Sequence, residues 1–113
     1  MMEKKVAYIA GPYRAATPHG IVQNIRRAEA VAIKYWKKGY VVICPHKNSA
    51  LFDGILSDEA WLEASCVLLA RCDVCVMMQG WERSEGARNE ESMARDNKME
   101  IIYDDGQTAE KLA

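Results

Sequence analysis

The chain has 113 residues, half of them hydrophobic, with 15 basic and 16 acidic side chains and a formal net charge of −1. A near-neutral chain without a run of Lys and Arg is not expected to bind polymeric nucleic acid. No apolar run approaches the roughly 20 residues that span a bilayer, and the first residues lack the basic and apolar regions of a secretory leader. We therefore expect one globular domain over residues 1–113, cytoplasmic and not bound to a membrane.

The amino-terminal part of the chain predicts a strand, a long helix and a second strand. Val6–Ala10 is an apolar run that ends at Gly11, which is typical of a buried strand. Thr17 is the expected N-cap of a helix that continues to Gly39. Residues 40–44 form the second expected strand, because they are again apolar and β-branched. The expected buried face of the helix comprises Ile21, Ile25, Ala28, Ala32, Tyr35 and Trp36.

A polar, irregular connection over residues 47–57 follows, and it fits either a lid or binding loop or a mobile linker. Ser57 or Asp58 is expected to cap the next helix. The buried side of that helix is expected to comprise Trp61, Leu62, Ser65, Leu68 and Leu69.

The carboxyl-terminal part predicts a strand over residues 72–78, a helix from Ser84 to about Lys98, a strand over residues 100–103 and a short terminal helix over residues 108–113. Strands that alternate with helices indicate right-handed crossovers and a parallel sheet covered on both faces. We therefore predict a three-layer α/β fold, flavodoxin-like or Rossmann-like, with four or five strands, four of them in the order 2-1-3-4.

Four cysteines, Cys44, Cys66, Cys72 and Cys75, lie in apolar segments and are expected to act as small hydrophobic residues in a reducing compartment. Cys72 and Cys75 have the C-x-x-C spacing of a redox or zinc half-site. That spacing runs into an expected strand, however, where alternate side chains point to opposite faces. We therefore expect no metal and no cofactor.

The most informative stretch runs from Gly80 to Glu90. Ser84 is an expected N-cap, and Gly86, Ala87 and Glu90 follow at helical spacing, so that small side chains share one face with a carboxylate. A packed face rarely carries a Glu without a functional reason, although Glu90 becomes a surface residue if the helix is rotated by about one position.

In a parallel sheet of this order, ligands bind outside the carboxyl ends of the strands, here between the first and third strands. The loops over residues 11–14 and 80–86 are expected to meet there, and they supply a helix N-terminus, two arginines and two aromatic rings. Taken singly, each residue also has a structural interpretation, as a solvated loop charge (Arg14, Arg83) or as the cover of a helix end (Tyr13, Trp81). Their convergence on one crevice favours a binding site.

Several motifs spread over residues 6–103 also resemble a known group of proteins. They are Tyr8-Ile9-Ala10-Gly11-Pro12-Tyr13-Arg14, Asn24 with Arg27-Ala28, Gly39-Tyr40, Pro45-His46, Cys72-Asp73 and the segment from Gly80 to Glu90. This pattern resembles an uncharacterised branch of small bacterial and phage proteins in the nucleoside 2-deoxyribosyltransferase-like superfamily. Its S-x-G-x-x-x-E element is also similar to that of the 2′-deoxynucleoside 5′-phosphate N-hydrolases.

The resemblance implies a single deoxyribosyltransferase-like domain that cleaves or transfers at an N-glycosidic bond, with Glu90 as the nucleophile. Tyr8 matches a tyrosine that orients this carboxylate, although a core aromatic residue is an equal interpretation. For a nucleoside 5′-monophosphate the phosphate would lie near Arg14 and the amides near Ser84 and Gly86, whereas for a free nucleoside Ser84 would bind a sugar hydroxyl. The candidate substrate-binding residues are Gly11, Tyr13, Arg14, His46, Trp81, Ser84, Gly86 and Ala87. An alternative interpretation of His46 is a hydrogen-bonded loop residue.

One position departs from the pattern. Active relatives carry an Asp that protonates the leaving base where this chain has Ser65, and a serine cannot serve as that acid. Glu63 or Asp58 would then be the acid, or the protein is weakly active, or it is a catalytically silent nucleotide-binding module. The resemblance also implies a homodimer or homotetramer, for which Trp36, Phe52 and Trp61 are candidate contacts.

Overall fold

Four parallel strands form the centre of the structure, a computed structural model in which residues 4–107 are described. The strands are β1 (Val6–Ala10), β2 (Val41–Ile43), β3 (Val74–Met77) and β4 (Glu100–Tyr103). They pair in the order β2-β1-β3-β4, which confirms the predicted α/β class and strand order. A fifth strand is not present within residues 4–107, and the expected helix over residues 108–113 lies outside the described part of the chain.

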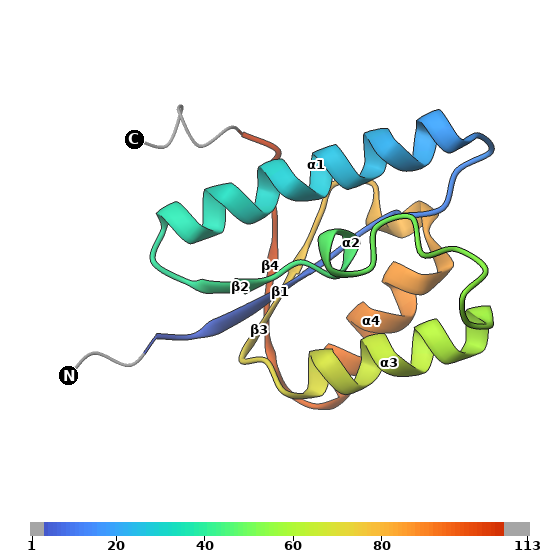
Figure 1. Ribbon diagram of the computed structural model, residues 1–113. Coiled ribbons are helices and arrows are strands. Elements are labelled where there is room, and N and C mark those ends of the chain that lie inside the picture. Colours follow the sequence, from blue (N-terminus) through green and yellow to red (C-terminus); the bar gives the residue numbers. More distant parts are fainter. Residues whose placement is uncertain (1–3, 108–113) are drawn as a thin grey trace.

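Helices cover both faces of this sheet (Figure 1). The helices are α1 (Pro18–Lys37), the single turn α2 (Pro45–Asn48), α3 (Asp58–Ala70), a 3-10 turn (Trp81–Arg83) and α4 (Glu85–Asp96). In Figure 1, α1 lies on one side of the strands and α3 and α4 lie on the other. The result is the three-layer, Rossmann-like arrangement that the alternating pattern predicted.

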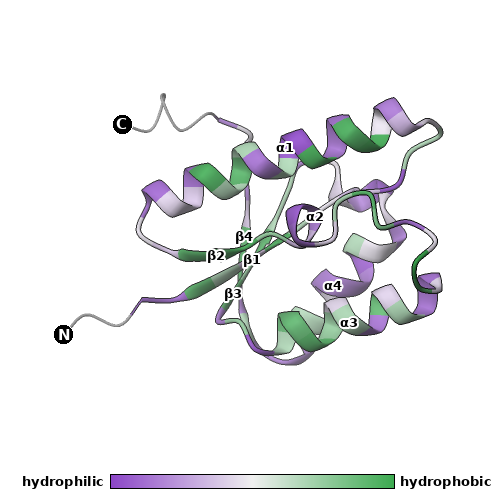
Figure 2. Cartoon of the chain, in the orientation of Figure 1, coloured by the Kyte–Doolittle hydropathy of each residue, from purple (hydrophilic) through white to green (hydrophobic). Residues whose placement is uncertain are grey.

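The two faces of β1 pack in two separate cores. Ala7 and Ile9 belong to the core beneath α1, whereas Tyr8 and Ala10 belong to the core beneath α3 and α4. Successive side chains of a strand point to opposite faces, which explains the alternation. Figure 2 shows hydrophobic residues along the central strands and along the part of α3 that precedes β3.

Short side chains begin the long helices as predicted. The hydroxyl of Thr17 accepts a hydrogen bond from the N–H of Gly20 at 3.0 Å, that of Ser57 from Ala60 at 3.1 Å, and that of Ser84 from Ala87 at 3.2 Å. Each bond satisfies one of the amides that a helix start leaves without an internal partner. These three helix starts are therefore determined locally.

The buried face of α1 differs from the prediction at its end. Trp36 is 52% exposed, whereas Lys34 is only 2% exposed. The Lys34 ammonium forms an ion pair with Asp104 at 2.5 Å and a second one with Asp105 at 3.1 Å, just after β4. A buried charge is tolerated when it is paired, and this pairing rotates the lysine inward and the tryptophan outward.

Two further expectations need correction. The chain after β2 forms the helical turn α2 before the irregular segment, because Pro45 suits the first position of a helix. On α3, Leu69 is buried but Leu62 is 45% exposed, so much of this apolar helix stays uncovered in the single chain.

Across the described chain, every helix is too short or too polar to span a bilayer.

Candidate functional site

A cleft of about 780 Å³ opens at the carboxyl ends of the strands, with α4 on one side and α3 with the segment before it on the other. Most of the residues that the sequence singled out line this cleft. They are Tyr8, Gly11, Tyr13, Arg14, His46, Asp58, Ser84, Gly86, Ala87 and Glu90. The volume is within the range of about 300–1,000 Å³ that is usual for small-molecule sites.

Glu90 and Tyr8 form a partly buried pair in the cleft. Tyr8 is on β1 and is fully buried, and its hydroxyl donates a hydrogen bond to the carboxylate of Glu90 on α4. Burial raises the pKa of Glu90 to about 7, although the hydrogen bond from Tyr8 acts in the opposite direction. Burial and the neighbouring Glu90 charge raise the pKa of Tyr8 well above its ordinary value, so this phenol remains a hydrogen-bond donor.

This pair exists because β1 and α4 come together over residues with little bulk. Ala10 and Ala87 are buried in the same core as Tyr8, and Ala87 lies on α4 one turn before Glu90. A large side chain at either position would move the helix away from the strand. The small residues in the sequence therefore serve to bring the carboxylate within reach of the phenol.

The loop after β1 is held by buried polar side chains. The side-chain amide of Asn24 on α1 donates to the carbonyls of Tyr13, at 2.9 Å, and Arg14, at 3.2 Å. Nε2 of His46 lies 2.8 Å from the carbonyl of Pro12. Burial lowers the pKa of His46, so the neutral ring donates this bond at pH 7, since a carbonyl can only accept.

Gly11 is required at the start of this loop by close packing. A Cβ at Gly11 would lie 2.4 Å from the sulfur of Met78 and 2.8 Å from its Cβ. Met78 is buried, so it has little room to move away. The loop can pass this close to β3 only without a side chain at that position.

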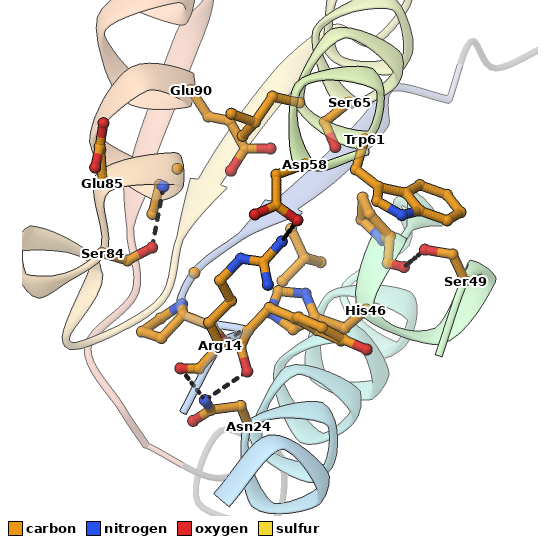
Figure 3. Close-up of a pocket in the computed structure, with 18 of the residues that line it drawn as sticks. Arg14, Asn24, His46, Ser49, Asp58, Trp61, Ser65, Ser84, Glu85 and Glu90 are labelled. Atoms are coloured by element: carbon orange, nitrogen blue, oxygen red, sulfur yellow. Dashed lines mark hydrogen bonds and ion pairs between the residues drawn. The ribbon is translucent and has the colours of Figure 1, made fainter. Parts of the chain in front are cut away.

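Two side chains of the same loop reach across the mouth of the cleft. The Tyr13 hydroxyl donates to Asp53 at 2.8 Å and accepts from the N–H of Leu51 at 3.1 Å. Arg14 forms an ion pair with Asp58, in the first turn of α3. Figure 3 shows Arg14 reaching from its loop to Asp58 in the middle of the cleft, while Glu90 points in from α4.

Trp81 and Glu63 do not join the cleft. Trp81 lies in the 3-10 turn and packs against Tyr103 at 5.9 Å between ring centroids, beside a separate open hollow. Glu63 is exposed on α3. The turn directs Arg83 toward the cleft and Trp81 away from it, which the spacing of these residues could not indicate.

The sequence reasoning also missed several residues that line the cleft. Ser49, Phe52 and Asp53 come from the segment over residues 47–57, which the sequence left open as a binding loop or a linker. The sequence signal available in this segment was the dipeptide Asp53-Gly54, because Asp-Gly pairs are typical of turns. Its placement beside Tyr13 depends on a contact between residues 40 positions apart.

Nothing in the described chain is arranged for a metal. Among residues 4–107 no group of three or more His, Cys, Asp or Glu side chains could hold a metal ion. All four cysteines are free, and burial raises the pKa of each thiol, that of Cys75 to about 12. The thiols therefore stay protonated at neutral pH and pack as small apolar groups.

Ser65 lies beside the phenol of Tyr8 and lines the cleft. Of the two candidate acids, Asp58 lines the cleft and Glu63 does not. The cleft thus contains the Glu90 carboxylate beside Tyr8 and three further carboxylates, Asp53, Asp58 and Glu85, of which Asp58 is paired with an arginine.

No curated protein matches the chain significantly. A family of domains matches residues 5–103, which include all the strands and helices within residues 4–107 and all the cleft residues described above. This match covers well over half of the chain. The protein therefore belongs to the family described as a domain of unknown function, DUF4406.

Proposed function

We propose that the protein cleaves or transfers at the N-glycosidic bond of a (deoxy)nucleoside or nucleoside 5′-monophosphate, with Glu90 as the nucleophile. The observation that carries this proposal is the Glu90 carboxylate, partly buried in a cleft of about 780 Å³ and held by the Tyr8 hydroxyl. Perturbed titratable groups in clefts are typical of catalytic sites. The resemblance to deoxyribosyltransferase-like proteins supplies the reaction class, and the geometry agrees with it.

The chemistry suits a carboxylate. Glu90 attacks the anomeric carbon, and the bond between that carbon and the base nitrogen breaks with its electron pair leaving on the base. A neighbouring acid or water protonates the departing base. Water or a second base then attacks the same carbon and releases Glu90, so the outcome is hydrolysis or transfer. The negative charge of Glu90 also stabilises the oxocarbenium character of the transition state.

Tyr8 has a defined part in this reaction. Its hydroxyl fixes the rotamer of Glu90 and lowers the pKa of the carboxyl, which burial alone would raise further. Both effects favour an ionised, oriented nucleophile near neutral pH. Tyr8 acts through Glu90 and is therefore a positioning residue.

The walls of the cleft suit the rest of a nucleotide. Arg14 and the first turn of α4, at Ser84 and Gly86, would contact a 5′-phosphate, because guanidinium groups and helix N-termini bind anions. With a free nucleoside, Ser84 would instead bind a sugar hydroxyl. Tyr13 and His46, whose ring centroids lie 5.9 Å apart, line the wall of the cleft nearest α2.

A catalytically silent nucleotide-binding module is the alternative, and Ser65 favours it. Of the two acids that could replace the missing Asp, Glu63 lies outside the cleft, and Asp58 is paired with Arg14 rather than free to protonate a base. In that case the protein would bind the nucleotide and leave the glycosidic bond intact. The expected homodimer or homotetramer is likewise a proposal, to be tested by light scattering.

Base release tests the enzyme against the binding module. The protein is incubated with a panel of deoxynucleosides and their 5′-monophosphates, alone and with an acceptor base, and products are separated by chromatography. We expect free or transferred base, and a loss of at least about a thousandfold in Glu90→Gln, as for other removed nucleophiles. Glu63→Gln is the matched control, because it makes the same change outside the cleft. Tight nucleotide binding without base release would contradict the proposal and support the module.

A further inference from the structure

The only ionic partner of Arg14 in the described structure is Asp58, and both side chains are largely in solvent. Arg14 is 63% exposed and Asp58 is 73% exposed. They lie on separate elements, the loop after β1 and the first turn of α3, and Figure 3 shows them meeting in the middle of the cleft. Exposed ion pairs contribute little to stability, so this one can open at small cost.

The loop backbone that carries Arg14 is held by hydrogen bonds, whereas the Arg14 guanidinium is exposed. Asn24 holds the carbonyls of Tyr13 and Arg14, and His46 holds that of Pro12. Asn24 and His46 are 5% and 6% exposed. The guanidinium can therefore turn between partners while the loop that carries it stays in place.

Asp58 differs from the other described carboxylates of the cleft because it is paired with an arginine. Asp53 accepts a hydrogen bond from the Tyr13 hydroxyl, and Glu90 accepts one from Tyr8. Among the described carboxylates that line the cleft, only Asp58 forms an ion pair with an arginine. A guanidinium binds phosphate with paired, charge-assisted hydrogen bonds, as it does a carboxylate, so a ligand anion and Asp58 compete for the same group.

We propose that Asp58 is a specificity-determining residue that occupies Arg14 until the phosphate of a nucleoside 5′-monophosphate replaces it. The exchange rests on the proposed function for the identity of the ligand. Asp58 lowers the affinity of the cleft for every anion, and weak anions do not displace it. A nucleoside without phosphate leaves the pair intact and gains nothing from Arg14.

Binding of inorganic phosphate, measured by calorimetric titration at constant ionic strength, tests the exchange without requiring catalysis. Asp58→Asn removes the competitor, and we expect phosphate to bind about two- to fivefold more tightly, the range that corresponds to a weak exposed ion pair. Arg14→Gln should weaken phosphate binding. In the double variant Arg14→Gln/Asp58→Asn the gain from Asp58→Asn should disappear. A gain in affinity cannot result from misfolding.

Asp53→Asn is the matched control, because it removes the same charge from the same cleft without freeing Arg14. An equal gain in Asp53→Asn, a gain that persists in the double variant, or an absence of phosphate binding in every variant would each overturn the exchange. The same titrations with deoxynucleoside 5′-monophosphates and their nucleosides should show a larger preference for the phosphate form in Asp58→Asn. Failure of base release leaves these binding results standing, so the two proposals fail separately.

Discussion

Replacement of Glu90 by Gln should stabilise the protein at alkaline pH, although it removes the proposed nucleophile. The side chain lies largely out of solvent in the cleft, and burial disfavours its charged form. Gln has nearly the same shape, is neutral at every pH, and its amide oxygen can still accept the hydrogen bond from Tyr8. The substitution thus removes the cost of a buried charge while keeping the contact.

The size of the effect follows from the pKa of Glu90, which rises from 4.5 to about 7 in the folded chain. Below pH 4.5 the carboxyl is protonated in both the folded and the unfolded chain. Between these values the folded chain holds more protons, so stability falls as pH rises, by about 3 kcal/mol in total at about 1.36 kcal/mol per pH unit. Water that enters the open cleft reduces this figure, and we expect Glu90→Gln to gain about 1–3 kcal/mol at pH 8.

Thermal and urea unfolding of both proteins at pH 4.5 and pH 8 measure this difference. The gain at pH 8 corresponds to roughly 4 °C in Tm per kcal/mol for a domain of this size, and it should vanish near pH 4.5. Glu63→Gln, at an exposed position, should show no such pH-dependent gain. If Glu90→Gln is less stable than the unmutated protein at pH 8, or equally shifted at both pH values, the burial argument is wrong.

Four further variants, one of them a control, test other parts of the structure. Tyr8→Phe removes the hydrogen bond that lowers the pKa of Glu90. The acid limb of the pH profile of kcat/KM for base release should therefore move from near pH 7 to higher pH by about one unit. An unchanged midpoint would contradict the positioning role of Tyr8. Gly11→Ala places a Cβ 2.4 Å from a buried methionine sulfur and should cost about 1–3 kcal/mol, whereas Gly86→Ala, with its nearest contact at 3.6 Å, should be neutral or stabilising in urea unfolding. Lys34→Met leaves its aspartate partner buried without a cation and should cost about 3 kcal/mol; a loss under about 1 kcal/mol would show that the pair does not matter for stability.

Much of the fold could be predicted because its signals are local. The apolar run before Gly11, the caps at Thr17 and Ser84 and the alternation of strands with helices depend on neighbours in the sequence. Parallel order and layers then follow from the handedness of crossovers. The strand ends were less accurate: the third strand was expected over residues 72–78 and is Val74–Met77, the stretch that pairs in register with residues 7–10 of β1.

The candidate site could be predicted only in part. Glu90 and the loop over residues 11–14 were identified because helix spacing and the switch point of the sheet place them at one edge. Trp81 was misplaced because one turn of 3-10 helix decides which of its neighbours faces the cleft. Asp53 escaped notice because its partner Tyr13 is distant in sequence, and no local pattern records such a contact.

The sequence by itself determined the strands, the helix starts and the presence of a carboxylate one turn into a helix of small residues, since each depends on residues within about one turn of each other. Only the tertiary structure decided that Lys34 rather than Trp36 is buried, that Arg14 faces Asp58, and that Glu90 lies against Tyr8. Burial and ionic partners are properties of the assembled layers. The chemistry of Glu90 depends on both, because the residue type provides the carboxylate and the packing sets its pKa.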